Sequence, residues 1–271
     1  LRAQVVMPDG ARVATAEGTP QGGVISPVLA NMALDGLERL LTERFKHRRK
    51  VNLVRYCDDF VITGASSALL EDEVQPLVAQ FLKERGLVLS EEKTRIVHID
   101  EGFDFLGFHF RKYHGKLLIK PAKASIAAVK GKIRAILQAG GSLPQDALIR
   151  RLNPIIQGWG GYYRHVVSKQ VFSDIDHAIW RMTWNWAKRR HPQRARKWVK
   201  DRYYTHKEGY DWVFTDGSVD LFRMLSIPIR RHVLVRGASN PFDPAHASYF
   251  AARRARQRTE APATAPAWLF L

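Results

Sequence analysis

The sequence contains a single cysteine, Cys57, among its 271 residues. One thiol excludes an internal disulfide and a zinc site built from cysteine pairs, and it agrees with a reducing compartment. No stretch approaches the roughly 18 apolar residues that a membrane-spanning helix requires. The first residues do not begin with Met and do not resemble a signal peptide. We therefore expect a cytoplasmic chain without a membrane partner, and we expect it to be a fragment of a longer protein.

Acidic residues are scarce in the second part of the chain. Residues 1–110 hold 13 Lys and Arg against 16 Asp and Glu, whereas residues 111–271 hold 30 against 10. A neutral part followed by a strongly basic part is typical of an enzyme core joined to a module that binds a polyanion. A basic surface that serves solubility alone is the simpler alternative, although such surfaces usually mix both signs.

The first part shows the patterns of an α/β arrangement. Pro8-Asp9-Gly10 predicts a tight turn, Ser26-Pro27 predicts the start of a helix, and Gly86 predicts the end of another. The expected elements are strands at 5–7 and 11–15, a helix at 27–45, strands at 51–56 and 60–63, a helix at 69–82, short strands at 88–89 and 96–99, and a hairpin that follows 103–110 and turns at 114–115.

After Pro121 the apolar spacing becomes helical. A first helix ends at Gly140, and a second contains Pro154 as a kink or a new turn. Ser173, with Asp176 three residues on, predicts the start of a third helix. The chain is therefore expected to be an α+β protein, with an α/β part at 1–120, a helical bundle at 121–192, a basic aromatic region at 193–258 and a disordered tail at 259–271.

Two neighbouring carboxylates stand in Tyr56-Cys57-Asp58-Asp59, between apolar runs that predict two strands. Successive residues of a regular strand point to opposite faces, whereas at a turn both acids can converge on cations above it. Nucleotidyl transfer requires such a device, because divalent ions with oxygen ligands activate a hydroxyl and neutralise developing charge. An ordinary acidic turn is the alternative.

A glycine-rich loop, Gly18-Thr19-Pro20-Gln21-Gly22-Gly23, precedes the first expected helix. Its backbone N–H groups can bind a strand or a phosphate, and Gln21 can hydrogen-bond to a nucleotide. By spacing alone, a plain turn that enters a helix is the better explanation.

Four blocks follow one another as GTPQGGVISPVLANMALDGLE, VRYCDDFVITG, ERGLVLSEEKTRIVH and FDFLGFHF. Their order and spacing resemble those of reverse transcriptases, most of all the enzymes encoded by bacterial group II introns. Later blocks, GWGGYYRHVVSK through IWRMTWNWAKRRHP, resemble that family's thumb and maturase domain, and VRGASNPFDPAHASYFAARR resembles the segment before its nuclease domain. The resemblance implies a partial polymerase palm at 1–120, an antiparallel sheet with helices, then a helical thumb and maturase domain at 121–192 and a DNA-binding region at 193–258.

The resemblance also implies roles at matching positions. Asp58 and Asp59 would be two of three carboxylates that bind two Mg²⁺ ions, with Tyr56 beside the primer terminus. Lys93 would face the departing pyrophosphate as a general acid, although a solvated lysine beside two acids is an equal alternative. Pro20, Gln21 and Gly22 would line the template and nucleotide pocket, and Phe105, Leu106, Gly107 and Phe108 would form the primer grip. Core packing explains most of the primer-grip side chains, with Gly107 allowing close backbone approach.

The chain departs from the family pattern at two points. Position 57 is usually Ala, and Cys57 is a small packing residue in its place. The family's first catalytic Asp lies in segments that would precede residue 1, and no residue here matches it. We therefore expect an incomplete metal site and no polymerase activity from this chain alone, while the intact protein is active. The histidines show neither CxxC companions nor HExxH spacing, so no nuclease metal site is expected.

Residues 181–202 hold nine Lys and Arg and one acid, Asp201, interleaved with tryptophans. Cations neutralise phosphates, and aromatic faces stack on unpaired bases. A helix with a solvated basic face and buried tryptophans is the alternative, and Trp186, which lies on the apolar stripe, is expected in the core. The expected RNA-binding residues are Trp159, Tyr163, Arg164, Arg181, Lys188, Arg189, Arg190, Arg196 and Lys197.

Three functions remain open. The first is an RNA-directed DNA polymerase of a group II intron that also supports intron splicing, with intron RNA, an RNA template, a DNA primer or target and dNTPs as partners, associated with the bacterial nucleoid. The second is a non-enzymatic RNA-binding maturase with a vestigial polymerase part. The third is a metal-dependent nuclease, which fits less well because no His lies near Asp58 and Asp59 as a general base. The intact 56–59 block favours the first.

Overall fold

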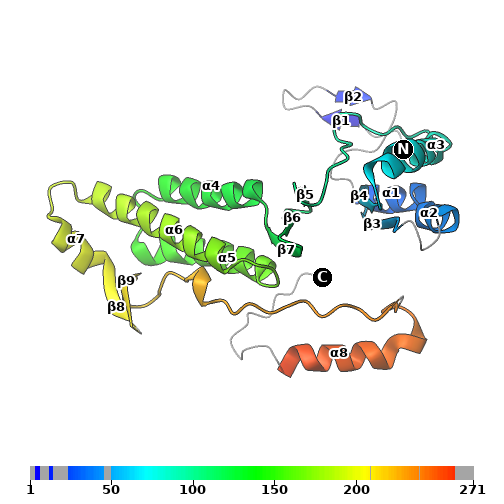
Figure 1. Cartoon of the computed structure of the whole chain (residues 1–271). Coiled ribbons are helices and arrows are strands. Elements are labelled where there is room, and N and C mark those ends of the chain that lie inside the picture. The colour runs from blue at the N-terminus through cyan, green and yellow to red at the C-terminus, as the bar shows by residue number, and fades with distance from the viewer. Residues whose placement is uncertain are drawn as a thin grey trace.

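The structure is a computed structural model that describes residues 4–6, 12–14, 24–45, 50–207, 209–237 and 239–259. Helices and small antiparallel sheets follow one another along the chain (Figure 1), which confirms the expected α+β class.

The first part contains β1 (Gln4–Val6), β2 (Arg12–Ala14), α1 (Ser26–Ala33), α2 (Leu37–Phe45), β3 (Asn52–Tyr56), β4 (Asp59–Thr63), the π-helical η2 (Leu69–Val74), α3 (Gln75–Lys83), β5 (Phe103–Phe105), β6 (Phe108–Tyr113) and β7 (Lys116–Pro121). The second part contains α4 (Lys123–Ala139), α5 (Gln145–Tyr163), α6 (Lys169–Arg190), α7 (Arg196–Tyr203), β8 (Tyr204–Lys207), β9 (Tyr210–Phe214), the short 3-10 helices η3 (Met224–Ser226) and η4 (Pro244–His246), and α8 (Ala247–Thr259).

The hairpin expected at the start of the chain is confirmed. β1 and β2 pair antiparallel, with Gln4 opposite Ala14. The expected turn at Pro8-Asp9-Gly10 lies outside the described residues.

The single helix expected at 27–45 is wrong, because α1 and α2 divide it. The chain turns at Gly36, whose φ of +85° is a left-handed conformation that glycine adopts without steric cost. Leu34, Leu37 and Leu41 are nevertheless buried in one core. The apolar spacing therefore runs on through the break and could not reveal it.

The first core lies between the helices of this part and the inner face of the β3–β4 hairpin. Leu53 and Phe60 of the hairpin pack against it. As expected, Gly86 closes the turn that follows α3, where φ is +70° and Leu87 N donates to the Leu82 carbonyl at 2.9 Å. The buried residues are Leu34, Leu37, Leu41, Phe45, Leu69, Val74, Val78, Phe81 and Leu82.

The short strands expected at 88–89 and 96–99 are wrong. Residues 84–102 are all described, and no strand occurs among them. Local hydrogen bonds satisfy this backbone instead, since Lys93 N donates to the Ser90 carbonyl and Gly102 N to the His98 carbonyl, both at 3.2 Å. A strand requires a neighbour for its N–H and C=O groups, and a short apolar run does not reveal whether one exists.

β5, β6 and β7 form a three-stranded antiparallel sheet in chain order. The turn between β6 and β7 lies at His114-Gly115, as expected, and both residues have positive φ, 47° and 81°. Two-residue hairpin loops favour this backbone because its twist matches that of the strands. The sheet leads through the buried Ala122 into the helical part of the chain.

α4, α5 and α6 pack into a helical bundle (Figure 1). The same core continues through Val199 of α7, Phe214 of β9 and Met224 of η3. Buried residues therefore lie on both sides of the boundary expected near residue 192.

The third helix starts earlier than expected. α6 begins at Lys169, so Ser173 lies inside the helix and its assignment as a cap is wrong. The Asp176 carboxylate instead accepts hydrogen bonds from Met224 N at 2.9 Å and Leu225 N at 2.8 Å. Burial raises the pKa of Asp176, although these two N–H groups oppose the shift. A local capping pattern could not identify partners 48 and 49 residues away.

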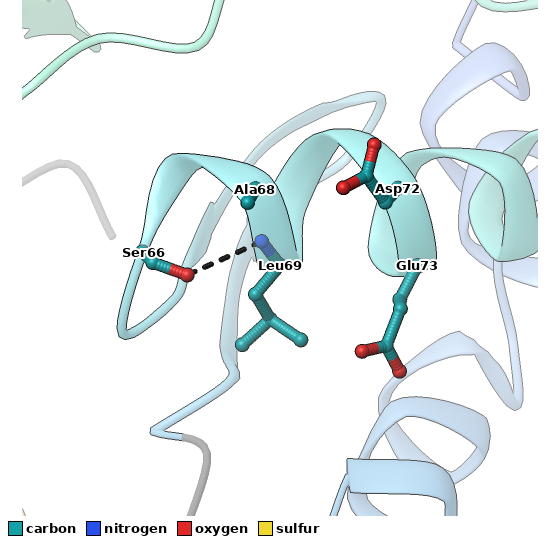
Figure 2. Close-up of a pocket in the computed structure, with 5 residues that line it drawn as sticks. All are labelled: Ser66, Ala68, Leu69, Asp72 and Glu73. Carbon is teal, nitrogen blue, oxygen red and sulfur yellow. Dashed lines mark hydrogen bonds between the residues drawn. The ribbon is translucent and has the colours of Figure 1, made fainter.

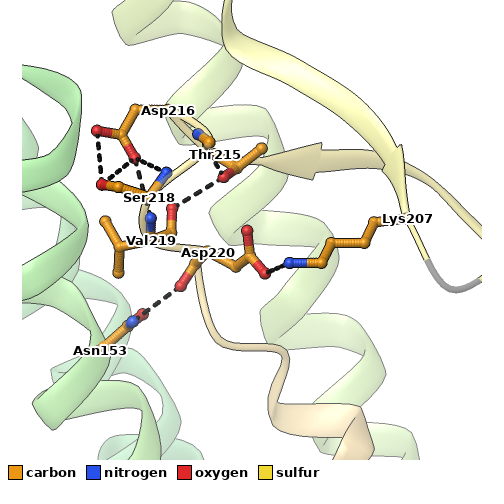
Figure 3. A network of polar contacts seen from close by, with 8 residues as sticks. Asn153, Lys207, Thr215, Asp216, Ser218, Val219 and Asp220 are labelled. Atoms are coloured by element: carbon orange, nitrogen blue, oxygen red, sulfur yellow. Dashed lines mark hydrogen bonds and ion pairs between the residues drawn. The ribbon is translucent and has the colours of Figure 1, made fainter.

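The loop after β9 is held by a network of polar contacts (Figure 3). The Asp216 carboxylate accepts hydrogen bonds from the Ser218 backbone N and hydroxyl, at 3.0 and 2.9 Å. Asn153 Nδ2 of α5 donates to the Asp220 carbonyl at 2.9 Å, and the Asp220 carboxylate pairs with Lys207 of β8. The loop thus joins the β8–β9 hairpin to the bundle.

Beyond η3 the chain runs as an extended segment toward α8 (Figure 1). Arg253 Nη1 of α8 donates to the Leu234 carbonyl at 3.0 Å, and the Tyr249 hydroxyl accepts from Arg236 N at 2.9 Å. The tail expected to be disordered lies, from residue 260 on, outside the described residues. No helix in the described ranges has both the length and the apolar character needed to cross a membrane.

Candidate functional site

The β3–β4 hairpin carries the two neighbouring acids at its tip. Tyr56 and Asp59 are the last paired residues, so Cys57 and Asp58 form a two-residue turn. This confirms the expected position of the hairpin tip. Asp58 and Asp59 are both exposed, and neither forms an ion pair or side-chain hydrogen bond with another described residue.

Arg55 ties this turn to α1. Its Nη1 donates to the Cys57 carbonyl at 3.1 Å and to Asn31 Oδ1 at 2.6 Å. Cys57 has a positive φ of 54°, a conformation that few non-glycine residues adopt. Arg55 is not among the site residues expected from sequence. Its position could have indicated a role, because it is a charged residue near the end of a mostly apolar strand.

Tyr56 lies on the opposite face of β3 from Arg55. The strand alternates between half-buried and exposed residues, and the Tyr56 side chain is 63% exposed. Its ring therefore stands free beside the acidic turn.

The donor set at the tip fits a divalent cation in part. Carboxylate oxygens are the ligands that Mg²⁺ prefers, and both carboxylates are accessible to solvent. Among the described residues, however, no three or more His, Cys, Asp or Glu side chains are grouped so that they could hold a metal ion. Asp58 and Asp59 are thus two candidate carboxylate ligands, with no third one grouped beside them in the described part of the chain.

The other residues expected around the nucleotide are not brought to the tip by any described contact. Lys93 lies exposed in the turn that follows Ser90, and its side chain has no partner among the described residues. Pro20, Gln21 and Gly22 lie outside the described residues.

The β5–β6 turn holds the residues expected as a primer grip. Phe105 and Phe108 are its last paired residues, and Leu106 and Gly107 form the turn with positive φ of 51° and 80°. Phe108 packs against the helical core, whereas Leu106 is 38% exposed. A side chain, not a second backbone, approaches Gly107 closely, because an added Cβ would lie 2.8 Å from the Tyr163 hydroxyl oxygen.

Several residues expected to contact RNA are engaged within the protein. Tyr163 is 4% exposed, and the ring of the half-buried Trp159 lies 4.3 Å from its ring. Arg190 Nη1 donates to the Gly141 carbonyl at 3.0 Å and to the Leu143 carbonyl at 2.6 Å. Its guanidinium therefore holds the loop between α4 and α5 against α6. Arg164 is half-buried.

Other basic residues of the same set remain accessible. Arg181 and Arg189 of α6 and Arg196 and Lys197 of α7 are exposed, and their side chains form no hydrogen bond, ion pair or ring contact with described residues. Lys188 is half-buried, with Nζ 6.0 Å from the centre of a Trp184 ring. Accessible cations that are not held in ion pairs can bind phosphates.

An aromatic cluster beside these cations was not expected from sequence. Trp212 of β9 lies edge-on to Trp180 and Trp184 of α6, with ring centres 5.7 and 5.4 Å apart. Lys200 of α7 places Nζ 4.9 Å from the Trp212 ring. The spacing of the two α6 tryptophans was visible in the sequence, but their partner on β9 was not.

A shallow hollow at the start of η2 does not contain any expected site residue. Ser66, Ala68, Leu69, Asp72 and Glu73 line it, and the Ser66 hydroxyl accepts a hydrogen bond from Leu69 N at 3.2 Å (Figure 2). The Ser66 contact is one that commonly forms at the start of a helix. We assign no ligand to this hollow.

Two family models match consecutive parts of the chain. The model described as "Reverse transcriptase (RNA-dependent DNA polymerase)" matches residues 4–110, and the model described as "Group II intron, maturase-specific domain" matches residues 126–204. The β3–β4 tip and the β5–β6 turn lie within the first match, and the helical bundle from residue 126 on lies within the second.

Two curated proteins are similar in sequence to part of this chain. Protein YkfC of Escherichia coli (strain K12) is 30% identical over 45% of this chain and 42% of its own length. The group II intron-encoded protein LtrA of Lactococcus lactis subsp. cremoris is 23% identical over 45% of this chain and 30% of its own length. The chain thus spans less than half the length of these relatives. With both family models matched in tandem, the chain belongs to the group II intron reverse transcriptases and maturases.

Proposed function

We propose that this chain takes part in RNA-templated DNA synthesis by a group II intron protein, with Asp58 and Asp59 as two of the carboxylates that bind Mg²⁺. The β3–β4 tip carries this proposal. Two exposed acids stand there, neither paired with a cation in the part of the chain that the structure describes, on a turn that Arg55 ties to α1. Such an arrangement keeps carboxylate oxygens available for metal ions.

Mg²⁺, when bound, supplies the positive charge that activates the primer 3′-hydroxyl and neutralises the departing phosphates. The residues of the chain would do the rest. Asp58 and Asp59 would hold the ions, the exposed Tyr56 would contact the primer end, and Lys93 would protonate the pyrophosphate. Pro20, Gln21 and Gly22 would line the nucleotide pocket.

Metal binding tests the first step, with Mn²⁺ as a paramagnetic substitute for Mg²⁺. We expect weak Mn²⁺ binding by the purified chain, because two carboxylates are an incomplete ligand set. Asp58→Asn and Asp59→Asn should each abolish it. Asp72→Asn is the matched control, because Asp72 is an exposed acid of η2 outside the tip, and it should bind Mn²⁺ like the unchanged chain.

Primer extension tests the activity itself. We expect no templated extension by the purified chain, and extension by a longer protein that contains it and supplies a third carboxylate. In that protein Asp58→Asn should abolish extension, whereas Asp72→Asn should not. Extension by the chain alone would contradict the incomplete site, and an active Asp58→Asn protein would end the polymerase proposal.

We also propose intron RNA as a partner of the helical part. The exposed cations of α6 and α7 support this, because 30 Lys and Arg stand against 10 acids in residues 111–271. A non-enzymatic maturase is the second candidate, favoured by the maturase-specific match at 126–204. Splicing of intron RNA separates the two. Full splicing support from an Asp58→Asn, Asp59→Asn double variant would show that this role does not depend on the metal ligands.

A further inference from the structure

The Gly107 carbonyl oxygen is the point at which the β5–β6 turn meets the helices. Three donors converge on it: Ala122 N at 2.9 Å, the Tyr163 hydroxyl at 3.0 Å and the Ser125 hydroxyl at 3.3 Å. Tyr163 is the last residue of α5, 56 positions along the chain from Gly107. Its hydroxyl is therefore a long-range connection between the turn and the bundle, whereas the other two donors lie at the start of α4.

The fit at this point leaves no room for a larger residue. A Cβ added to Gly107 would lie 2.8 Å from the Tyr163 hydroxyl oxygen and 3.1 Å from Ser125 Oγ. Gly107 also has a φ of +80°, which only glycine adopts freely. Two independent constraints therefore select glycine here, and one of them is contact with Tyr163.

The aromatic rings around this contact fix the tyrosine. Tyr163 lies edge-on to Phe108, with ring centres 5.0 Å apart, and 4.3 Å from Trp159. Because Tyr163 is 4% exposed, its ring has little freedom to move away from the turn. A shift of the turn would therefore have to disrupt this cluster.

Tyr162, the preceding residue, marks the outer side of the same junction. Its ring is 51% exposed and stacks on Phe108 at 5.3 Å, beside the exposed Leu106. The pKa of Tyr162 is raised by burial, then by Tyr163 and by Tyr56, so the tyrosine of the β3–β4 tip lies within electrostatic range.

We propose that Tyr163 is a positioning residue which, through the Gly107 carbonyl, fixes the β5–β6 turn against the bundle and so sets how a primer–template duplex is held. The inference rests on the proposed function and deepens it, since it names the contact that orients one duplex-binding segment. In this proposal the buried Tyr163 does not touch the duplex. Tyr162 and Leu106, which are exposed beside Tyr163, would face the duplex.

The test compares two adjacent tyrosines given the same change. Tyr163→Phe removes the hydroxyl that holds the turn, whereas Tyr162→Phe removes only a 3.4 Å contact with the Leu106 carbonyl at an exposed position. The readouts on the purified chain are affinity for an RNA–DNA primer–template duplex, affinity for a structured RNA hairpin, and melting temperature. We expect Tyr163→Phe to weaken duplex binding about fivefold, the worth of one ordinary hydrogen bond, with hairpin binding unchanged.

A second pair of variants tests the same contact from the glycine side, in case Tyr163→Phe lowers the stability of the chain. Gly107→Ala should weaken duplex binding more than Gly115→Ala, because φ at Gly115 is +81° but no atom lies within 4 Å of an added Cβ there. Combining Gly107→Ala with Tyr163→Phe should bind the duplex no worse than Gly107→Ala alone, because removing the hydroxyl relieves the overlap. A structural role alone predicts additive losses in all three readouts.

The outcomes separate the inference from the function on which it rests. Duplex binding by the unchanged chain, with equal affinity for Tyr163→Phe and Tyr162→Phe, would overturn the positioning role and leave the proposed function standing. Absence of duplex binding by the unchanged chain would overturn both. Equal losses of duplex and hairpin binding in Tyr163→Phe would also overturn the inference.

Discussion

The Arg55 guanidinium donates from Nη1 to Asn31 Oδ1 at 2.6 Å. The same nitrogen reaches the Cys57 carbonyl at 3.1 Å, so one side chain joins α1 to the turn that carries Asp58. Both acceptors are neutral oxygens, so neither of these contacts is an ion pair. Through them, Arg55 stabilises the backbone of the turn that precedes the two acids.

Removing the two hydrogen bonds of Arg55 should make the turn more mobile. We expect Arg55→Met to speed amide hydrogen exchange at Cys57 and Asp58 and to lower the free energy of unfolding by about 1 kcal/mol, the usual worth of such a hydrogen bond. Arg39→Met is the control, because Arg39 is exposed on α2 without a described side-chain partner. Equal exchange rates in the two variants would show that Arg55 does not hold the turn.

Glycines of α5 should respond oppositely to the same substitution. A Cβ on Gly160 would lie 2.9 Å from Met224 Cγ and closer still to Ile227, whereas one on Gly158 meets nothing within 4 Å. Gly160→Ala should therefore destabilise the chain by about 1–3 kcal/mol through overpacking. Gly158→Ala should stabilise it by about 0.5–1 kcal/mol, because alanine favours the helix. Chemical denaturation measures both, and a stable Gly160→Ala variant would contradict the close packing of η3 on α5.

The Lys207–Asp220 pair should make stability depend on acid. The hydrogen bond from Lys207, and then that from Thr215, hold the pKa of Asp220 below its usual 3.8. A lowered folded-state pKa means stability that is present above about pH 4 and is lost as pH falls through that pKa. Asp220→Asn should be less stable than the unchanged chain at neutral pH, with the difference fading in acid.

The size of this effect should be small, within the ~0–1 kcal/mol range of exposed ion pairs, and should shrink with added salt. Urea unfolding at several pH values measures it. A difference that grows on acidification would have the wrong sign and would exclude the pair as its cause.

Two neighbouring arginines of α6 should behave differently on charge reversal. Arg189 is exposed without a described partner, so Arg189→Glu should weaken binding of structured RNA while leaving the melting temperature near that of the unchanged chain. Arg190 donates to two carbonyls of the loop between α4 and α5, so Arg190→Glu should lower the melting temperature. Unchanged RNA affinity of Arg189→Glu at moderate salt would remove this residue from the proposed interface.

Turns and helix ends were the most predictable local features. Gly86 and His114-Gly115 lie where their turn chemistry indicated, because a positive φ depends on the residue itself. The tip at Cys57-Asp58 was equally local, since apolar strands on either side leave only the turn between them. The division between α1 and α2 at Gly36 was missed, because buried leucines continue the helical spacing on both sides.

Polar side chains were harder to assign than apolar ones. Asp176 matched a capping pattern, but its partners lie on η3. Arg190 and Tyr163 matched an RNA-binding composition, but their polar atoms bind backbone carbonyls of distant segments. A basic or aromatic residue looks the same in sequence whether its partner is a nucleic acid or its own chain.

The sequence by itself determined the family, the α+β class, the acidic turn and the position of most helices, because each depends on residues close together in the chain. Only the tertiary structure decided which cations remain accessible and which residues hold the β5–β6 turn in place. Those outcomes depend on contacts between segments about 50 residues apart, such as Tyr163 with Gly107. A hydrogen bond of that kind forms only when packing has brought the two groups together, and no local pattern encodes it.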